Sequence, residues 1–252
     1  MKKVISLAIV ASGILFAGKG VELAPVEPIS ITPTPVASNI LSSNGVALKV
    51  GTLGVGVDVE HMFSKKHGLR LNVNGIKVSR DEEIEGIDYD LDLTLLTAGL
   101  LYDYHPWESA FRLSAGFYYN GNKIEGVARP STSEIYEIGD KRYELTSNAK
   151  LDAKIDFKKT APYLGIGWSS TESNGWHFTA DIGVMYVGSP KVSYKLSGTT
   201  GSVKDVDTGA IVDIEDDGTL KQEIEKEKAE IVDEIKDYKW WPVIMIGIQK
   251  KF

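Results

Sequence analysis

Residues 87–96 read IDYDLDLTLL, and this stretch decides the fold class. Polar and apolar residues alternate in it, so that large apolar side chains separate Asp88, Asp90 and Asp92. Because successive side chains of a strand point to opposite faces, the alternation predicts a β-strand. In a soluble sandwich the apolar face would pack on a second sheet. In a membrane barrel it would face lipid, and the aspartates would face a polar lumen.

The composition excludes several classes of function. The chain has 252 residues, of which 28 are basic and 35 acidic, and its formal charge is -7. A nucleic-acid-binding domain normally shows a basic face, so we expect no nucleic-acid partner. The chain has no cysteine, which excludes disulfides and thiolate metal sites. No metal-ligand or cofactor motif is present either, and we expect neither a metal nor a cofactor.

The N-terminal residues predict secretion. Residues 1–20 begin with two lysines after the initial methionine, continue with a 14-residue apolar stretch and end in small residues. This is the pattern of a signal peptide, and the apolar stretch is too short for a comfortable membrane span. Residues 21–44 are rich in Pro, Ser and Thr and predict a flexible leader. The folded domain is then expected over 45–252.

Several other segments alternate in the same way as the opening stretch, which itself continues to about residue 104. They are 46–63, 68–78, 110–120, 150–168, 175–196 and 240–252. Their apolar faces run for about 9–11 residues, the length that a tilted strand needs to cross a bilayer. In 150–168 the apolar face changes parity, which predicts a bulge near Pro162. Bacterial single-chain barrels have an even number of strands, so we expect an eighth strand in 28–42 or in 134–145.

The faces opposite the apolar ones predict a charged lumen. Inward positions on this interpretation are Arg70, Asp88, Asp90, Asp92, Arg112 and Asp181. An eight-stranded barrel has an interior just wide enough for its side chains, and buried charges are costly unless they are paired. We therefore expect a lumen held together by salt bridges, with an ion-selective pore as the alternative.

The connections and the aromatic residues support a membrane barrel. The segments 63–68, 104–109 and 169–175 are short, whereas 121–149 and 197–238 are long and polar. Short turns on one rim and long loops on the other are typical of outer-membrane barrels, which also carry aromatic girdles at both interfaces. Candidate girdle residues are Tyr102, Trp107, Trp168, Trp176, Trp240 and Trp241.

The last long loop contains the predicted helix. In 219–238, Thr219 and Gln222 form a capping box, and the apolar stripe is too narrow for a buried helix. We expect a solvated helix, with a cap on the barrel mouth as the alternative. The preceding acidic stretch has Gly209 where a calcium loop needs its third ligand, so it is interpreted as a solvated loop.

The C-terminal strand resembles the signal by which outer-membrane proteins are recognised by the barrel-assembly machinery. Phe252 ends this strand and shares a face with Ile244, Ile246 and Ile248, although Lys250 stands where an apolar residue is usual. More of the chain is similar to an uncharacterised proteobacterial family of small outer-membrane barrels. The matching pieces are GTLGVGVDVE (51–60), FRLSAGFYYNGNKI (111–124), APYLGIGW (161–168), DIGVMYVGSPKVS (181–193) and KWWPVIMIGIQKKF (239–252).

This resemblance implies an all-β fold, an antiparallel transmembrane β-barrel in the class of the OmpA and OmpW barrels. It places the protein in the outer membrane of a Gram-negative bacterium and brings no catalytic motif. The implied partners are outer-membrane lipid, lipopolysaccharide and, during biogenesis, the barrel-assembly machinery. We expect a monomer.

The expected function is therefore non-enzymatic: a structural role, or a narrow passive pore for small solutes. The alternative is a surface interaction or adhesion protein that acts through its long loops. A lipid-modifying enzyme would need a base beside a nucleophile, with an orienting carboxylate. His177, Thr179 and Asp181 alternate on one strand face, but this spacing often arises by chance.

Overall fold

The computed structural model describes residues 2–3, 43–84, 87–130, 133–146, 148–170, 174–199 and 201–252. Most of the predicted signal peptide, 1–20, and of the predicted leader, 21–44, lies outside the described residues. The candidate eighth strand at 28–42 lies outside them as well.

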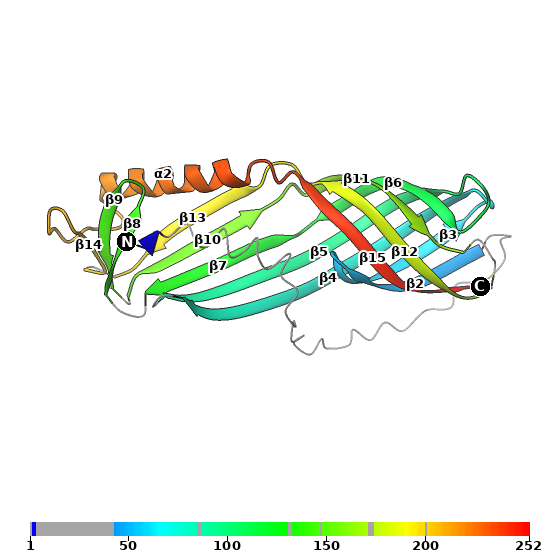
Figure 1. The fold of residues 1–252 in the computed structure, drawn as a ribbon, viewed down its shortest axis with the longest axis horizontal. Coiled ribbons are helices and arrows are strands. Elements are labelled where there is room, and N and C mark those ends of the chain that lie inside the picture. Colours follow the sequence, from blue (N-terminus) through cyan, green and yellow to red (C-terminus); the bar gives the residue numbers. More distant parts are fainter. Residues whose placement is uncertain are drawn as a thin grey trace.

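The described chain consists of strands and one α-helix, arranged as an elongated molecule with a barrel at one end and a smaller β-structure at the other (Figure 1). The strands are β1 (Lys2–Lys3), β2 (Ser43–Gly51), β3 (Gly54–Met62), β4 (His67–Ile84), β5 (Ile87–Tyr104), β6 (Phe111–Asn120), β7 (Lys123–Pro130), β8 (Glu134–Ile138), β9 (Lys141–Leu145), β10 (Lys150–Asp156), β11 (Thr160–Trp168), β12 (Gly175–Tyr186), β13 (Lys191–Ser197), β14 (Val203–Asp205) and β15 (Trp240–Lys251). The helix is α2 (Gly218–Ile235).

Eight of these strands close into a ring. Their order is β5-β4-β3-β2-β15-β12-β11-β6, and β6 pairs with β5 again. Every pair in the ring is antiparallel. The predicted antiparallel barrel of eight strands is therefore confirmed.

The strand that the sequence reading missed lies at the start of the ring. Residues 46–63 form two strands, β2 and β3, joined by a turn at Thr52–Leu53. Gly54 follows the turn with φ +92, a conformation that glycine adopts at little cost. The prediction of an eighth strand in 134–145 is wrong, because these residues form the hairpin β8–β9 in a second sheet.

The two ends of the barrel differ. At one end the backbones of Asn44 and Phe252 exchange hydrogen bonds of 3.1 and 3.0 Å. The short connections 63–66 and 105–110 and the described residues of 169–174 lie at the same end, which we name the turn rim. At the other end most strands continue into the smaller β-structure. We name this part the head; it comprises the described residues of 76–94, 121–159 and 187–239.

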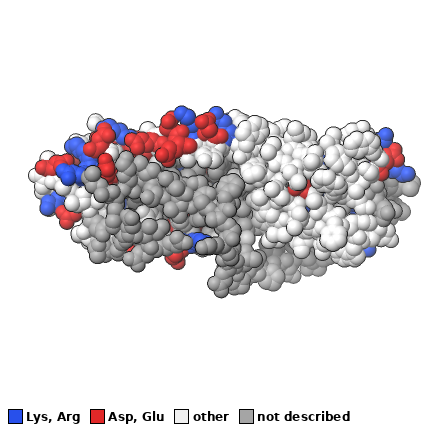
Figure 2. Space-filling model, viewed as in Figure 1, with Lys and Arg blue, Asp and Glu red and all other residues white. Residues whose placement is uncertain are grey.

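The outer surface of the barrel is apolar on every one of its strands. Its large exposed hydrophobic residues, the apolar belt, are Val46, Leu48, Val50, Val55, Val57, Val59, Leu69, Leu71, Val73, Leu96, Leu100, Leu113, Phe117, Leu164, Ile166, Phe178, Ile182, Val184, Ile244, Ile246 and Ile248. Figure 2 shows a nearly uncharged surface over the barrel and charged side chains gathered over the head. Soluble monomers rarely expose a contiguous apolar surface of this extent, so the belt faces lipid.

On each of the strands β4 and β5, the apolar residues change from the outward face to the inward face where the barrel meets the head. Each has 18 residues and spans about 60 Å at 3.4 Å per residue. Along β4 the outward residues change from the exposed Leu71 and Val73 to the exposed Lys77. The inward residues change from the buried polar Asn74 to the half-buried Ile76. The barrel is therefore apolar outside and keeps its charged side chains inside, whereas the head has an apolar core and charged side chains outside.

This inversion corrects the predicted position of three aspartates on β5. Asp88, Asp90 and Asp92 do not line the lumen; they lie on the outer face of the head, where Asp90 pairs with Arg129. The alternating apolar residues, Tyr89 and Leu91 among them, are buried in the head core. Alternation correctly identified two faces, but the medium that each face meets changes along the strand from lipid to water.

The head has its own hydrophobic core. Beyond the ring, residues 87–94 of β5 pair with β7, and the sheet continues through β10 to β13. A second sheet of order β1-β8-β9-β14 and the helix α2 pack against it. The core contains Tyr89, Leu91, Ala128, Tyr136, Ile138, Tyr143, Leu145, Ala149, Leu151, Val192, Tyr194, Leu196, Val203, Val212, Leu220 and Ile231. The segments predicted as long loops thus fold into a compact unit.

The predicted bulge near Pro162 is also corrected. Pro162 lies within β11, in register with Phe117 of β6. The change of parity occurs earlier, at 157–159, where β10 ends and β11 begins. It marks the passage from the head, where apolar residues face inward, to the barrel, where they face outward.

The helix α2 begins and packs differently from the prediction. Its N-cap is Asp217, whose carboxylate accepts the N–H of Leu220 at 2.7 Å, and not Thr219. Leu220 and Ile231 are buried in the head core, so the helix is not fully solvated. Among the described residues, no helix has the length and apolar character needed to cross a membrane.

Two buried carboxylates of α2 hold the β8–β9 hairpin. Glu223 accepts the N–H of Asp140 at 2.7 Å, and Glu227 accepts the N–H of Gly139 at 3.2 Å. Burial alone would raise the pKa of Glu223, but the Asp140 N–H and the Lys226 ammonium outweigh it and lower that pKa. The carboxylate is therefore ionised at neutral pH and fixes the helix to the hairpin.

Candidate functional site: the barrel lumen

Charged residues from nearly every barrel strand meet in the lumen near the turn rim. These buried residues, the lumen network, are Lys49, Asp58, Glu60, Arg70, Asp103, Arg112, Asp181 and Lys251. The set holds four acids and four bases, so its formal charges cancel. Among the ring strands only β11 contributes none of them.

Asp181 on β12 is the centre of the lumen network. One carboxylate oxygen, Oδ2, lies 2.5 Å from Lys49 Nζ and 3.0 Å from Arg70 Nη1. The other, Oδ1, lies 2.7 Å from Arg112 Nη2. A single carboxylate thereby joins strands β2, β4 and β6, which lie on different sides of the barrel wall.

Arg70 on β4 makes the second junction. Its Nε and Nη2 atoms donate to both carboxylate oxygens of Asp103 at 2.8 and 3.1 Å, a bidentate pair. Its Nη1 atom also donates to Asp58 at 3.0 Å. Ser114 donates to Asp103 at 2.5 Å, so this carboxylate is held by an arginine and a hydroxyl. The structure thus brings the predicted residues Arg70, Arg112 and Asp181 into one connected network.

Glycines on the inner face make room for the largest lumen side chains. A Cβ atom on Gly167 of β11 would lie 2.8 Å from Asp181 Oδ1 and 2.9 Å from Arg112 Nε. A Cβ atom on Gly183 would lie 2.6 Å from the Tyr163 ring. All three distances are too short for a Cβ atom. The Asp181–Arg112 ion pair therefore occupies the space beside Gly167, and the Tyr163 ring occupies the space beside Gly183.

A second group of polar residues closes the lumen at the turn rim. Glu60 pairs with Lys251 at 3.3 Å and accepts from Ser169 at 3.2 Å. Ser169 also donates to Gln249 at 2.7 Å. His105, in the connection 105–110, is buried, and its Nδ1 donates to the Ser109 carbonyl at 2.8 Å. Burial lowers the pKa of His105, so this ring is neutral at pH 7.

Towards the head, an apolar cluster fills the lumen. Its buried residues are Leu53, Leu95, Leu101, Tyr118, Ala161, Tyr163, Met185, Val187, Trp241, Val243 and Met245. The Tyr118 and Tyr163 rings meet edge to face with centroids 5.4 Å apart, and Asn72 donates to the Tyr118 hydroxyl at 2.8 Å. Because a barrel of this size is just wide enough for its side chains, the network and the cluster together fill the described lumen.

Most candidate girdle residues lie on the outer surface at a belt edge. Tyr102, Trp107, Trp168, Trp176 and Trp240 are all exposed. Trp241 is the exception: it is 6% exposed and packs edge to face on Phe157 inside the barrel. Adjacent residues of a strand point to opposite faces, so Trp240 and Trp241 could not both reach lipid.

The residues of the suggested assembly signal share the outer face of β15. Ile244, Ile246 and Ile248 are exposed on this strand, and Phe252 is exposed directly after it. Their recognition by the assembly machinery stays a prediction.

The suggested catalytic row does not form a base–nucleophile pair. His177 Nε2 lies 3.2 Å from the Asn174 carbonyl, and the Thr179 hydroxyl accepts from Arg112 at 3.4 Å. Asp181 is engaged by three cations of the lumen network. In the part of the chain that the structure describes, no group of three or more His, Asp or Glu side chains is placed to hold a metal ion.

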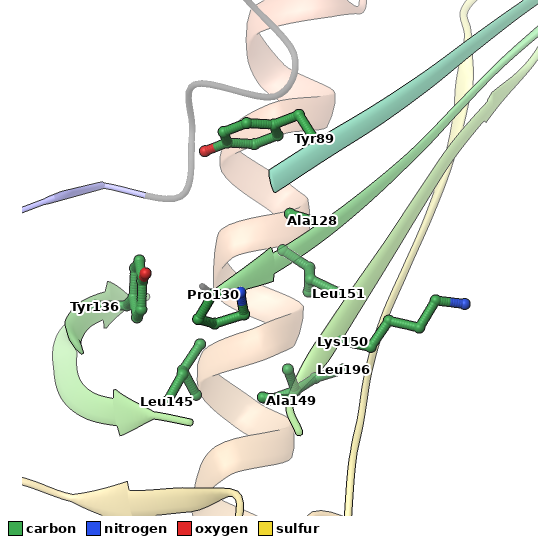
Figure 3. A pocket seen from close by; sticks show the side chains of 9 residues that line it. All are labelled: Tyr89, Ala128, Pro130, Tyr136, Leu145, Ala149, Lys150, Leu151 and Leu196. Carbon is green, nitrogen blue, oxygen red and sulfur yellow. The ribbon is translucent and has the colours of Figure 1, made fainter. Parts of the chain in front are cut away.

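A small pocket lies in the head, between the β8–β9 hairpin and the strands β5, β7, β10 and β13 (Figure 3). It is lined by Tyr89, Ala128, Pro130, Tyr136, Leu145, Ala149, Lys150, Leu151 and Leu196. Its volume is about 20 Å³. Small-molecule sites usually need about 300–1,000 Å³, so this pocket is a packing defect of the head core and not a substrate site.

The sequence reading missed five members of the lumen network: Lys49, Asp58, Glu60, Asp103 and Lys251. Asp58 and Glu60 were placed on the polar face of 46–63 but were not counted among the lumen charges, and Lys49 was hidden because β2 and β3 were read as one strand. A change of parity between Val50 and Val55, both exposed, was the available signal for the turn. If the polarity of 87–96 is carried unchanged along β5, Asp103 falls on the lipid face, whereas the structure buries it in the lumen.

Comparison with known proteins gives the same architecture. Acinetobacter baumannii CarO2 matches at 25% identity with a TM-score of 0.54, over 85% of this chain and 100% of that chain. CarO of the same species matches at 23% identity with a TM-score of 0.54, over the same shares of the two chains. A major outer membrane protein from Thermus thermophilus matches at 12% identity, over 84% of this chain and 100% of that chain, with a TM-score of 0.40. No protein-family model and no curated protein matches the chain.

The belt and the closed ring, together with the fold shared with CarO2, identify an outer-membrane β-barrel protein whose strands cross the membrane. Its location is the cell outer membrane. In such barrels the short turns lie on the periplasmic side and the long connections outside the cell. The turn rim is accordingly periplasmic, and the head is extracellular.

Proposed function

We propose that this outer-membrane barrel is a non-conducting, non-enzymatic anchor that holds a folded head at the cell surface. The observation that carries the proposal is the filled lumen. The neutral lumen network occupies it near the periplasmic rim, and the apolar cluster occupies it towards the head. An ion would have to separate buried ion pairs and then cross an apolar layer.

The alternative of a narrow passive pore is disfavoured by the same geometry. A conducting lumen needs a continuous path of water, whereas Arg70, Arg112 and Asp181 are joined directly by hydrogen bonds of 3.0 Å or less. Desolvating an ion costs several kcal/mol, and separating a buried pair leaves charges without partners. Neither cost is offset in a lumen whose described side chains are ion-paired in the lumen network or packed in the apolar cluster.

Single-channel recording in a planar bilayer tests this proposal. We expect the refolded mature protein to insert without producing discrete conductance steps, while a general porin measured in the same bilayers conducts. Discrete openings whose ion selectivity changes in Asp181→Asn would contradict the proposal and restore the pore.

A second candidate, recognition of a partner by the head, is favoured by the organisation of the long connections. They supply β7, most strands of the second sheet, the helix α2 and part of the head core, whereas a purely structural barrel needs only short turns. On the face shown in Figure 2, most of the charged side chains lie over the head.

A variant that lacks the head distinguishes the anchor function of the barrel from recognition of a partner by the head. The chain enters and leaves the head at three places, and at each place the two backbone segments already lie side by side. Asn120 N–H donates to the Lys159 carbonyl at 2.7 Å, and Val187 N–H donates to the Lys239 carbonyl at 2.8 Å. At the third place, Gly75 of β4 is in register with Leu96 of β5. Short turns at these three places would remove the head and keep the ring. We expect the trimmed chain to fold as a heat-modifiable barrel, because the strand pairing that closes the ring is complete within 43–75, 96–120, 160–186 and 240–251.

The readout is the detergent sensitivity of a strain that lacks the native protein. If the trimmed chain restores resistance as well as the full chain does, the barrel alone is sufficient and the head has no part in this function. If only the full chain restores it, the head acts by recognition.

A further inference from the structure

One row of outward-facing residues crosses the head directly beyond the apolar belt. It consists of Lys77, Thr94, Lys123, Asp156 and Lys191, one residue from each of β4, β5, β7, β10 and β13, and each is in register with the next. The residues that flank them along the strands face inward and are apolar, for example Ile155 and Val192. We name this set the lysine row.

The height of the lysine row places it at the surface of the bilayer. The last exposed belt residue on β5 is Leu96, which is in register with Gly75 of β4. Lys77 and Thr94 follow two residues further out. Two residues of a strand span about 7 Å, so the lysine ammonium groups lie at the level of the lipid headgroups.

The charge of the outer face changes sign with distance from the belt. The lysine row carries three lysines and one aspartate, a formal charge of +2. The next row outward is Ser79, Asp92, Glu125, Lys154 and Ser193, with a charge of -1. The row after that is Asp81, Asp90, Val127, Asp152 and Lys195, with a charge of -2. The positive charge is concentrated next to the membrane.

The lysines of the row are accessible. The Lys77 side chain is 60% exposed and pairs with Asp92 at 3.0 Å, on its outer side. Lys123 pairs with Glu125 at 2.5 Å, again with a residue further from the belt. Lys191 is exposed and forms no ion pair with a described residue. Solvent-exposed pairs of this kind are weak and exchange readily.

The neighbouring connection adds more positive charge at this level. Lys158 and Lys159 are exposed in 157–159, between Asp156 and the first residue of β11. Lys158 Nζ lies 5.8 Å above the Tyr186 ring, at the outer end of β12. Lysine stems lie along apolar and aromatic surface while their ammonium groups reach polar partners, which suits a membrane interface.

We propose that the lysine row binds phosphate groups of the anionic lipid in the outer leaflet. Lysines close to a charged membrane surface are attracted to lipid phosphates, and the attraction falls off within a Debye length. The acidic rows further out would be repelled by the same phosphates. The change of charge from the lysine row to these rows therefore also fixes the depth of the barrel in the bilayer. The proposal does not depend on whether the barrel conducts.

Binding of bis-phosphorylated lipid A to the full-length mature protein in detergent micelles tests the proposal. The test variant carries Lys77→Gln, Lys123→Gln and Lys191→Gln. The matched control carries Lys150→Gln, Lys195→Gln and Lys204→Gln, which remove the same charge from exposed positions further out. We expect the test variant to bind lipid A about tenfold more weakly and the control to change by less than about twofold.

The other outcomes overturn the proposal. Equal losses in the two variants would show a general effect of net charge, and no loss in either would show that the row does not bind lipid. Equal binding of a dephosphorylated lipid A would assign the affinity to the acyl chains. Displacement of lipid A by millimolar inorganic phosphate would point to a site for free phosphate. Both variants are expected to fold, because every substituted lysine is outside the two cores, and heat-modifiability checks this.

Discussion

Asp181→Asn is expected to destabilise the barrel by about 3–5 kcal/mol, the usual cost of removing one partner from a buried ionic group. The Asp181 carboxylate neutralises Lys49, Arg70 and Arg112, and all four side chains are buried. Asparagine has nearly the same shape but no charge. The variant would leave four bases facing three acids in a lumen that water reaches poorly.

The measurement is equilibrium unfolding in urea of the protein refolded into lipid vesicles, followed by tryptophan fluorescence. The matched control is Asp90→Asn, which removes the same group from an ion pair on the head surface. Asp90 is 45% exposed and pairs with Arg129, so its loss is expected to cost about 0–1 kcal/mol. A loss of less than about 1 kcal/mol for Asp181→Asn would mean that the network does not hold the barrel together.

Leu71→Arg is expected to cost about 2–4 kcal/mol, as for an arginine near the middle of the bilayer on the lipid face of a barrel. Leu71 lies in the belt part of β4, and its side chain is 58% exposed. An arginine there would have to lose its hydration or distort the bilayer. The free energy of unfolding in vesicles measures this cost.

The control is a second arginine substitution on the outward face of β4, at a position in the head instead of the belt. Ser79 is eight residues further along β4, in the head, and Ser79→Arg is expected to change stability by less than about 0.5 kcal/mol. The new guanidinium would lie beside Asp92, the present hydrogen-bond partner of Ser79. Equal costs for the two arginines would contradict a change from lipid to water along β4.

The presence of the strands could be predicted from the sequence, because the alternation of polar and apolar residues is a local property of the chain. The barrel strands β4, β5, β6, β12 and β15 were all recognised from the period of two, and their apolar faces set the class of fold. Arg70 and Arg112 were expected to need partners, because a buried guanidinium is too costly alone, and the structure pairs them with Asp103 and Asp181. Which acids would pair with them could not be predicted, since the acids that contact Arg70 lie 12, 33 and 111 residues away along the chain.

The predicted lumen aspartates show where local reasoning fails. The pattern in 87–96 fits a lipid-facing strand and a soluble strand equally well. Asp88, Asp90 and Asp92 lie on the outer face because β5 extends past the ring and pairs with β7 there. The length of β5 would have indicated this. A strand of 18 residues is longer than a bilayer crossing needs, so one half lies in the membrane and the other in water.

By itself, the sequence determined the period of each strand, the division of each strand into two faces, and the absence of thiol chemistry. These properties depend on neighbouring residues and on composition. Only the tertiary structure decided which face meets lipid, water or lumen, and which charges pair. Those depend on ring closure, which brings Lys49, Arg70 and Arg112 around Asp181 and lifts the head out of the membrane. Burial of a charge is set by the whole ring, and no single strand contains that information.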